Sequence, residues 1–394
     1  MALLRRVLLP AVALTVGTLA LSGCSGALLD LHAGSDPQHS SARITLSPVP
    51  TGKPVAPATP VVVSVRAGRL TDVVMTGPDG PVPGSLSVDG LTWTSTGGTL
   101  DYAAAYSVNA QAVDRTGLPT RLRGTIRTVA PSAFLGLSVT PREGATVGVG
   151  MPVRVDLDHR ISTPAARAAL EKRLSVTVDG EPVLGGWRWQ SDDVLLYRPG
   201  VFWKGDATVS VSADLKGVRL APGLWGRADV TSTFRTGPAM VSYVDMLTDQ
   251  MRVTRDGVDI RTIPITTGKA GFETRIGTKV VMSKERTRVM DAATGGTLPT
   301  DPEYYRLEVE YAMRVTNSGE FLHAAPWSVR HQGHENVSHG CTGMSTADAA
   351  WLYANTRVGD VVVYTGGSRR LEPGNGITVW NVSWQRWKQY SALA

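Results

Sequence analysis

Short runs of β-branched and aromatic residues, separated by tight-turn signals, fill most of the chain after residue 58, and this pattern restricts it to a mainly β fold. Asp-Gly dipeptides beginning at Asp79, Asp89, Asp179 and Asp256 mark turns between such runs. Helix-like spacing is confined to residues 164–173 and to segments after residue 345. A chain of 394 residues also exceeds one ordinary core, so we expect several domains.

Two stretches have the strand and turn spacing of small β-sandwiches, residues 59–130 and residues 131–237. The strands expected in them cover 61–65, 102–113, 120–129, 153–157, 174–178 and 207–213. Each stretch has a Val-Asp-Gly turn shortly before tryptophan, and we expect these tryptophans (Trp93, Trp187 and Trp189) to be core residues.

A third β-rich domain is predicted over residues 238–366, with a hairpin formed by 251–254 and 258–265 and a buried strand over 319–325. Ser345 and Asp348 form an N-terminal cap for a helix. The apolar stripe expected on this helix is Ala347, Ala350, Trp351 and Ala354. Residues 367–394 form a tail subdomain, whose Trp380, Trp384 and Trp387 are expected to pack against the preceding domain.

The first 23 residues have the features of a signal peptide, with Arg5 and Arg6 before a short apolar run. The run is shorter than a membrane-spanning helix. It ends in Leu-Ser-Gly directly before Cys24, which resembles the bacterial lipobox and predicts lipidation of Cys24. Residues 24–58 are rich in Ser, Pro, Gly and Ala, which predicts a lipid-anchored linker. We therefore expect an extracytoplasmic protein of the cell envelope, anchored to the cell membrane; plain secretion and a retained anchor are the alternatives.

The net charge of +6 comes from scattered arginines, with no dense basic block. This distribution fits an ordinary surface charge or attraction to an anionic envelope polymer. The absence of a nucleic-acid-binding motif, together with the export signal, argues against a nucleic-acid partner.

The chain has two cysteines, so lipidation of Cys24 would leave Cys341 without an intramolecular partner. A thiol attacks carbonyl groups as the thiolate, which requires a base or a positive environment. His323 and His339 are candidate bases. Gly340 allows a tight turn that points backbone amides at an oxyanion. The alternative is a buried, inert cysteine.

The order of His323 and then Ser338-His339-Gly340-Cys341 resembles the signature of the L,D-transpeptidase catalytic domain (YkuD type) of actinobacterial envelope enzymes. The two β units resemble the immunoglobulin-like modules of that family. The resemblance implies a peptidoglycan L,D-transpeptidase that forms 3-3 cross-links through a cysteine thioester and releases the terminal D-alanine of a tetrapeptide stem. Its partners would be the donor stem peptide, an acceptor amine and carbapenem inhibitors, and no cofactor or metal is implied.

The resemblance also implies residue roles. Cys341 is the nucleophile, His323 is the base, and the Ala324 carbonyl orients the imidazole. His339 supports the acceptor side or the pocket, and the amides of Gly340 and Cys341 form the oxyanion hole. The implied substrate-binding residues are Tyr305, Met290, Ser338, Thr342, Gly343 and Trp327.

Three positions depart from the family pattern. Gly343 replaces a common Asn, whose function is then lost or moved to Thr342. Arg275 replaces a usual proline, and Gly295-Gly296 lies where some relatives have a second flap tyrosine.

Three rival functions remain open. Water in place of the acceptor amine would make the protein an L,D-carboxypeptidase. The histidines at 323, 331, 334 and 339 together with Cys341 suggest a zinc-binding module. A non-catalytic wall-binding protein is the third.

Overall fold

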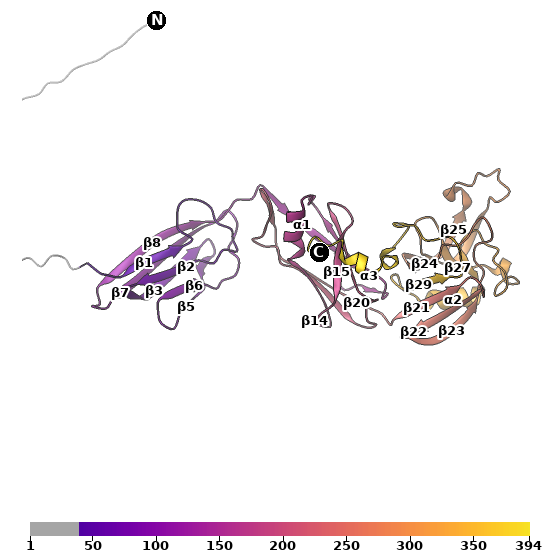
Figure 1. Cartoon of the computed structure of the whole chain (residues 1–394), viewed down its shortest axis with the longest axis horizontal. Helices are drawn as coiled ribbons and strands as arrows, with labels where there is room; N and C mark the ends of the chain where they lie inside the picture. Colours follow the sequence, from indigo (N-terminus) through magenta and orange to yellow (C-terminus); the bar gives the residue numbers. More distant parts are fainter. Residues whose placement is uncertain (1–38) are drawn as a thin grey trace, which may run out of the picture.

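The computed structural model describes residues 39–394, so the predicted signal peptide, Cys24 and the first part of the predicted linker lie outside the described residues. Figure 1 shows three β-rich units in a row, with the C-terminal helix returning to the middle unit. Within residues 39–394, no helix is long and apolar enough to cross a membrane.

The first unit is a sandwich of two antiparallel four-stranded sheets, with strand orders β1-β2-β6-β5 and β4-β3-β7-β8. Alternating residues of both sheets, among them Val63, Val108 and the predicted core residue Trp93, fill its interior. The strands are β1 (Arg43–Ser47), β2 (Val62–Arg66), β3 (Gly68–Gly77), β4 (Gly80–Val82), β5 (Gly84–Leu86), β6 (Thr92–Ser95), β7 (Ala105–Asp114) and β8 (Pro119–Arg127).

Strand β1 lies inside the predicted linker, which is therefore shorter than expected at its C-terminal end. Arg43 to Ser47 pairs with β2, and Leu46 is buried in the sandwich core. Val55 then forms a bridge with Thr128. This strand was not predicted, because the prolines and serines around it are typical of a linker. Within it, Ile44 and Leu46 alternate with exposed residues and face the core.

The second unit packs a four-stranded sheet (β10-β12-β16-β15) and a five-stranded sheet (β11-β20-β17-β13-β14) around Trp187, Trp203 and Phe234. Helix α1 (Pro164–Glu171) forms where the sequence predicts it, with Thr163 as N-cap and Pro164 at its first position. The strands are β9 (Ala133–Leu135), β10 (Leu137–Thr140), β11 (Thr146–Val147), β12 (Val153–Leu157), β13 (Leu174–Val178), β14 (Glu181–Pro182), β15 (Gly185–Trp189), β16 (Val194–Pro199), β17 (Thr208–Ala213), β18 (Arg219–Ala221), β19 (Leu224–Gly226) and β20 (Val230–Thr236).

The third unit has a five-stranded sheet (β23-β22-β21-β29-β24) and a four-stranded sheet (β25-β26-β27-β28). Asp256 and Gly257 both have positive φ and join β22 to β23, so the predicted hairpin is confirmed. The strands are β21 (Met240–Asp245), β22 (Gln250–Arg255), β23 (Val258–Pro264), β24 (Gly277–Val280), β25 (Ser283–Asp291), β26 (Arg306–Arg314), β27 (Phe321–Ala324), β28 (Thr342–Met344) and β29 (Val361–Thr365); the short 3-10 helices are η1 (Ala292–Gly295) and η2 (Pro326–Ser328).

Helix α2 (Thr346–Asn355) follows β28 and covers the β26–β27 side of the four-stranded sheet. The predicted cap is confirmed, because the Ser345 side chain accepts a hydrogen bond from the Asp348 amide. The predicted stripe is wrong. Ala349 and Leu352 are the buried residues, whereas Ala347 and Ala354 are exposed, because the short helix meets the sheet along one i, i+3 row only.

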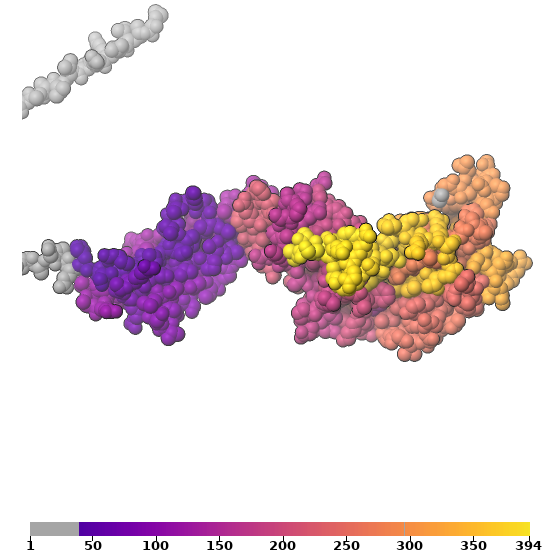
Figure 2. Space-filling model, viewed as in Figure 1, coloured from indigo at the N-terminus to yellow at the C-terminus, as the bar shows by residue number. Residues whose placement is uncertain are grey.

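The C-terminal segment contacts both neighbouring units. As predicted, part of it packs on the catalytic unit, where Glu372 pairs with Arg275 and Asn381 bonds to Thr278. Trp380, Trp384 and Trp387 do not lie on that unit, as the sequence suggested, but on the middle unit. Figure 2 shows this segment, in yellow, extending over both units. Trp387 on α3 (Trp384–Lys388) is fully buried and donates its indole N–H to the Gly186 carbonyl. The Trp380 indole, in η3 (Val379–Asn381), donates to the Gly150 carbonyl. The sequence therefore reveals the apolar stripe of tryptophans, but it does not reveal which surface the stripe packs against.

Candidate active site

Parallel pairing of β27 with β28 brings the two main candidate residues together. His323 is opposite Gly343 in the register, and Cys341 directly precedes β28. Both side chains line one pocket of about 200 Å³. The lining residues are Thr266, Met290, Tyr305, Leu307, Val309, His323, Ala325, Trp327, Ser328, Val337, Ser338, His339, Cys341 and Gly343. The pocket wall is mostly apolar, with the thiol and the two imidazoles as its chemically reactive groups.

The turn that presents Cys341 is held by three hydrogen bonds. Gly340 has φ +119°, a conformation that favours glycine. The Ser338 hydroxyl donates to the Cys341 carbonyl (2.7 Å) and accepts from the Gly340 amide (3.1 Å). The Thr274 hydroxyl donates to the Gly340 carbonyl at 2.9 Å. Ser338 therefore braces the turn, and the Gly340 amide expected in an oxyanion hole is already engaged.

The thiol of Cys341 points toward the loop before β27. Its sulfur lies 3.7 Å from the Gly319 carbonyl oxygen, in the position of a weak S–H donor. Burial raises the pKa of this thiol to about 11, and the nearby Glu320 carboxylate acts in the same direction. At neutral pH the resting cysteine is therefore protonated, so catalysis requires a base.

His323 is arranged to be that base. Its side chain is buried, and Nδ1 lies 2.7 Å from the Ala324 carbonyl oxygen. A carbonyl only accepts, so Nδ1 carries the proton and Nε2 has the free lone pair. Burial lowers the pKa of His323, which keeps the imidazole neutral near pH 7. The Ala324 carbonyl thus lies where the expected orienting role requires it.

His339 belongs to a charged cluster that the sequence did not indicate. Its Nε2 lies 2.6 Å from a carboxylate oxygen of Glu303, and Lys269 contacts the same oxygen at 2.6 Å. The hydrogen bond from Lys269, followed by that with His339, lowers the pKa of Glu303. The imidazole also packs against Phe272 and Tyr305, with centroids 4.6 and 4.9 Å away. Glu303 is 36 residues from His339, so no local spacing signals the contact.

A flap between β25 and β26 covers one side of the pocket. Met290 and Tyr305 lie at its two ends and pack with Phe321 and Cys341 in a small apolar cluster. Burial raises the pKa of Tyr305 to about 12. Gly296, with φ +94°, ends η1 within this flap. The structure thus places Met290 and Tyr305 against the thiol.

The remaining predicted residues divide into two groups. Trp327 is 56% exposed at the pocket and Gly343 lines its wall. A Cβ added at Gly343 would lie 2.9 Å from the Ala325 Cβ and 3.2 Å from a Thr266 methyl group, so this wall leaves no room for Asn without a shift. Thr342, predicted to bind substrate, does not line the pocket: its side chain is fully buried, and its hydroxyl lies 2.9 Å from the Tyr364 hydroxyl.

The residues suggested as zinc ligands do not gather at one point, because His331 and His334 lie outside the pocket that His323, His339 and Cys341 line. His331 Nδ1 lies 2.7 Å from a Glu335 carboxylate oxygen, outside the pocket. In the part of the chain that the structure describes, no group of three or more His, Cys, Asp or Glu side chains is arranged to hold a metal ion.

Comparison with protein families gives two matches. Residues 240–363 match the L,D-transpeptidase catalytic domain, and residues 52–219 match a bacterial Ig domain. The first range contains the whole pocket. The second spans parts of both N-terminal β units.

Individual relatives extend over most of the chain. L,D-transpeptidase 2 of Mycobacterium tuberculosis (strain CDC 1551 / Oshkosh) is 35% identical over 337 residues, which cover 85% of this chain and 81% of the relative. L,D-transpeptidase 5 of Mycobacterium tuberculosis (strain ATCC 25618 / H37Rv) is 32% identical over 393 residues, covering 97% and 84%. A solved structure of the L,D-transpeptidase LdtMt1 in complex with imipenem aligns with a TM-score of 0.50 at 35% identity, over 60% of this chain and 100% of that one.

Proposed function

The chain belongs to the L,D-transpeptidase family and is an L,D-transpeptidase, and we propose that Cys341 carries the acyl group from a peptidoglycan tetrapeptide stem to an acceptor amine. The observation that supports this assignment best is the shared pocket, in which a neutral, buried His323 with a free Nε2 lies beside the chain's one described cysteine.

In the first half-reaction, rotation about the Cα–Cβ bond of Cys341 turns the sulfur from Gly319 toward the pocket, and Nε2 of His323 takes the thiol proton. The thiolate attacks the carbonyl carbon of the amide that joins the third stem residue to D-alanine. The tetrahedral intermediate then collapses with cleavage of the C–N bond. The imidazolium returns its proton to the leaving nitrogen, D-alanine departs, and a thioester remains.

In the second half-reaction, the acceptor amine attacks the thioester carbonyl and gives a proton to Nε2 of His323. The C–S bond breaks, an amide forms, and Cys341 takes the proton back. The apolar flap at Met290 and Tyr305 lowers access of water to the thioester, which favours the amine over hydrolysis. A third-residue side-chain amine as acceptor gives the 3-3 cross-link.

Acylation by a carbapenem tests the nucleophile. Intact-mass analysis after incubation with imipenem should show one adduct on the wild-type chain and none on Cys341→Ala. An adduct that persists in the alanine variant would exclude Cys341 as the acylated residue. With disaccharide-tetrapeptide as substrate, cross-linked dimers indicate transpeptidation, whereas free tripeptide indicates the carboxypeptidase alternative.

The base is tested by histidine variants. His323→Ala should lower turnover by about two to four orders of magnitude, the usual contribution of a positioned acid–base group. His339→Ala should lower it less, because His339 contacts Glu303 and the flap rather than serving as the proton acceptor. His331→Ala, outside the pocket, is the matched control and should leave turnover unchanged. A larger loss for His339→Ala would reverse the assignment.

We also propose that the chain is exported and anchored to the outer face of the cell membrane through a lipid on Cys24, on the basis of the Leu-Ser-Gly-Cys motif. Replacement of Cys24 by Ala, together with an ordinary cleavage site, should move the protein from the membrane fraction to the soluble fraction. Unchanged membrane association would favour a retained apolar anchor.

A further inference from the structure

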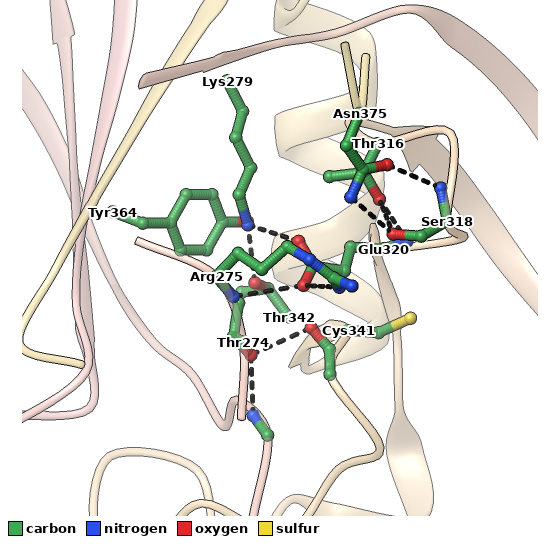
Figure 3. Close-up of polar contacts among 12 residues, drawn as sticks. Thr274, Arg275, Lys279, Thr316, Ser318, Glu320, Cys341, Thr342, Tyr364 and Asn375 are labelled. Atoms are coloured by element: carbon green, nitrogen blue, oxygen red, sulfur yellow. Dashed lines mark hydrogen bonds and ion pairs between the residues drawn. The ribbon is translucent and has the colours of Figure 1, made fainter. Parts of the chain in front are cut away.

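A buried group of charged side chains lies close to Cys341 (Figure 3), and none of them lines the substrate pocket. Its centre is Lys279 on β24, whose side chain is 0% exposed. The Lys279 ammonium contacts a Glu320 carboxylate oxygen at 2.5 Å and lies 3.6 Å from the centroid of the Tyr364 ring. A wholly buried lysine is unusual in a protein interior and requires a partner.

Two cations share the Glu320 carboxylate. Besides Lys279, Arg275 donates to it from Nη1 (2.9 Å) and from its backbone amide (3.1 Å). The outer side of Arg275 pairs with the half-exposed Glu372, through Nε at 2.5 Å. The single negative charge of buried Glu320 thus faces two positive charges, those of Lys279 and Arg275. The second positive charge is compensated by Glu372, which lies toward solvent.

This group touches the segments on both sides of the nucleophile. Glu320 is preceded by Gly319, whose carbonyl oxygen contacts the Cys341 sulfur, and followed by Phe321, whose backbone amide faces the same sulfur. On the other side, Thr342 bonds to the hydroxyl of Tyr364, the ring beneath Lys279. Side-chain changes in the charged group therefore reach Cys341 both through the backbone and through the electric field.

We propose that Lys279 and Glu320 are positioning residues for Cys341. With Arg275 they hold the 319–321 backbone against the resting thiol, and their opposite charges set how readily the sulfur becomes a thiolate when His323 takes its proton. The proposal rests on the proposed function in one respect, the assignment of Cys341 as nucleophile.

The electrostatic effect of each of the two residues on the pKa of the Cys341 thiol has a definite sign. Lys279 lowers the pKa of the Cys341 thiol, whereas Glu320 raises it. The other titratable groups around the sulfur are Tyr305 and Tyr364, together with His323 across the pocket. A residue that only supports packing would change the thiol in the same direction whichever partner is removed.

The test is the rate of iodoacetamide alkylation at pH 7, followed by intact mass, on the full chain carrying Cys24→Ser so that Cys341 is the single thiol. Burial lowers the pKa of Lys279 to about 8, so at pH 7 its ammonium still carries its charge. Lys279→Met should slow alkylation on the order of tenfold, and Glu320→Gln should speed it. The exposed pair on the neighbouring strands provides the controls Arg286→Gln and Glu310→Gln, which should leave the rate unchanged.

Rate changes of both variants in the same direction, or no change in either, would overturn the proposal. Removal of one partner leaves an unpaired buried charge, so thermal unfolding must first show that each variant is folded. If either is not, Arg275→Gln decides: it keeps the Lys279–Glu320 contact, and its alkylation at pH 7 should also slow. An unchanged rate would again refute the proposal. Failure of the proposed function would appear elsewhere, as full transpeptidase activity in Cys341→Ala.

Discussion

The middle unit meets its two neighbours in different ways. At its junction with the first unit, one tyrosine provides most of the specific contact. The Tyr102 hydroxyl donates to the Gly226 carbonyl at 2.7 Å and accepts from the Gly217 amide at 2.8 Å. Its ring packs edge-on against Phe134. A partly exposed Lys216–Asp101 contact at 3.3 Å contributes little.

The junction with the catalytic unit is formed by both backbone and side-chain contacts. The amides of Gly148 and Gly150 donate to the carbonyls of Val358 and Gly359 at 2.9 and 2.8 Å. The tail then adds a second layer, in which the guanidinium of Arg198 lies over the rings of Trp380, Trp384 and Trp387. Glu171 accepts hydrogen bonds from the Ser391 hydroxyl and the Ala392 amide.

This difference indicates that the two junctions differ in rigidity. The pocket and the second β unit form one body, since non-contiguous segments tie them together. The first unit is joined through a small polar contact, and such interfaces permit relative motion. We therefore expect the active site to keep a fixed orientation relative to the middle unit. The first unit is expected to change its orientation relative to the other two.

Loss of the tail contact should have the largest effect. Trp387→Ala removes a fully buried indole, and we expect a loss of about 3–5 kcal/mol in the free energy of unfolding. The catalytic unit and the middle unit should then unfold in separate calorimetric transitions. Gln385→Ala, exposed on the same helix, is the control. A single transition at unchanged temperature would mean that the tail does not couple the two units.

The same junction should depend on pH through Asp360. Burial raises the pKa of this carboxyl to about 7, and its Oδ1 has no hydrogen-bond partner among residues 39–394. Because the folded pKa is above the unfolded one, the favourable contribution is complete at low pH and is lost as pH rises through 7. The loss is up to about 4 kcal/mol by pH 8.

Asp360→Asn should remove this dependence and stabilise the protein above pH 7. Urea unfolding at pH 5 and pH 8 measures the difference between the variant and the wild type, with exposed Asp79→Asn as control. Equal differences at the two pH values would show that the carboxyl titrates outside this range.

The smallest effect is expected at the first junction. Tyr102→Phe removes one hydroxyl that serves two hydrogen bonds, and the expected loss is about 1 kcal/mol. Small-angle X-ray scattering should show a broader distribution of shapes, whereas the rate of carbapenem acylation should stay the same. A change in acylation rate would connect the first unit to the pocket and weaken the comparison.

Local features of the fold were predictable from sequence because their causes are local. The Asp256-Gly257 hairpin and the Ser345 cap each depend on residues within four positions of one another. The direction of the Thr342 side chain was not predictable, because it required knowledge that residues 342–344 form a strand beside β27.

Contacts between distant segments were the main omissions at the site. Glu303 reaches His339 across 36 residues, and Lys279 reaches Glu320 across 41. No periodicity or motif encodes such pairs in a single sequence. From the sequence alone, Lys279 on β24 and Glu320 in the loop before β27 look like ordinary surface charges, because nothing shows that the assembled sheets bury both.

The returning tail also has a consequence for the order in which the protein folds. The Arg198 guanidinium bonds to the Val382 carbonyl across 184 residues, and Ala392 reaches Glu171 across 221. Contacts of such long sequence separation form slowly, because a large loop must close before they contribute. Each β unit can acquire its own core early, and the backbone contacts of Gly148 and Gly150 need the chain only as far as Gly359. The second layer of the joint between the middle unit and the catalytic unit must wait for residues 380–392. Until then the Trp380, Trp384 and Trp387 side chains and the surface around Arg198 are both uncovered, which makes this interval the one most open to proteolysis and aggregation.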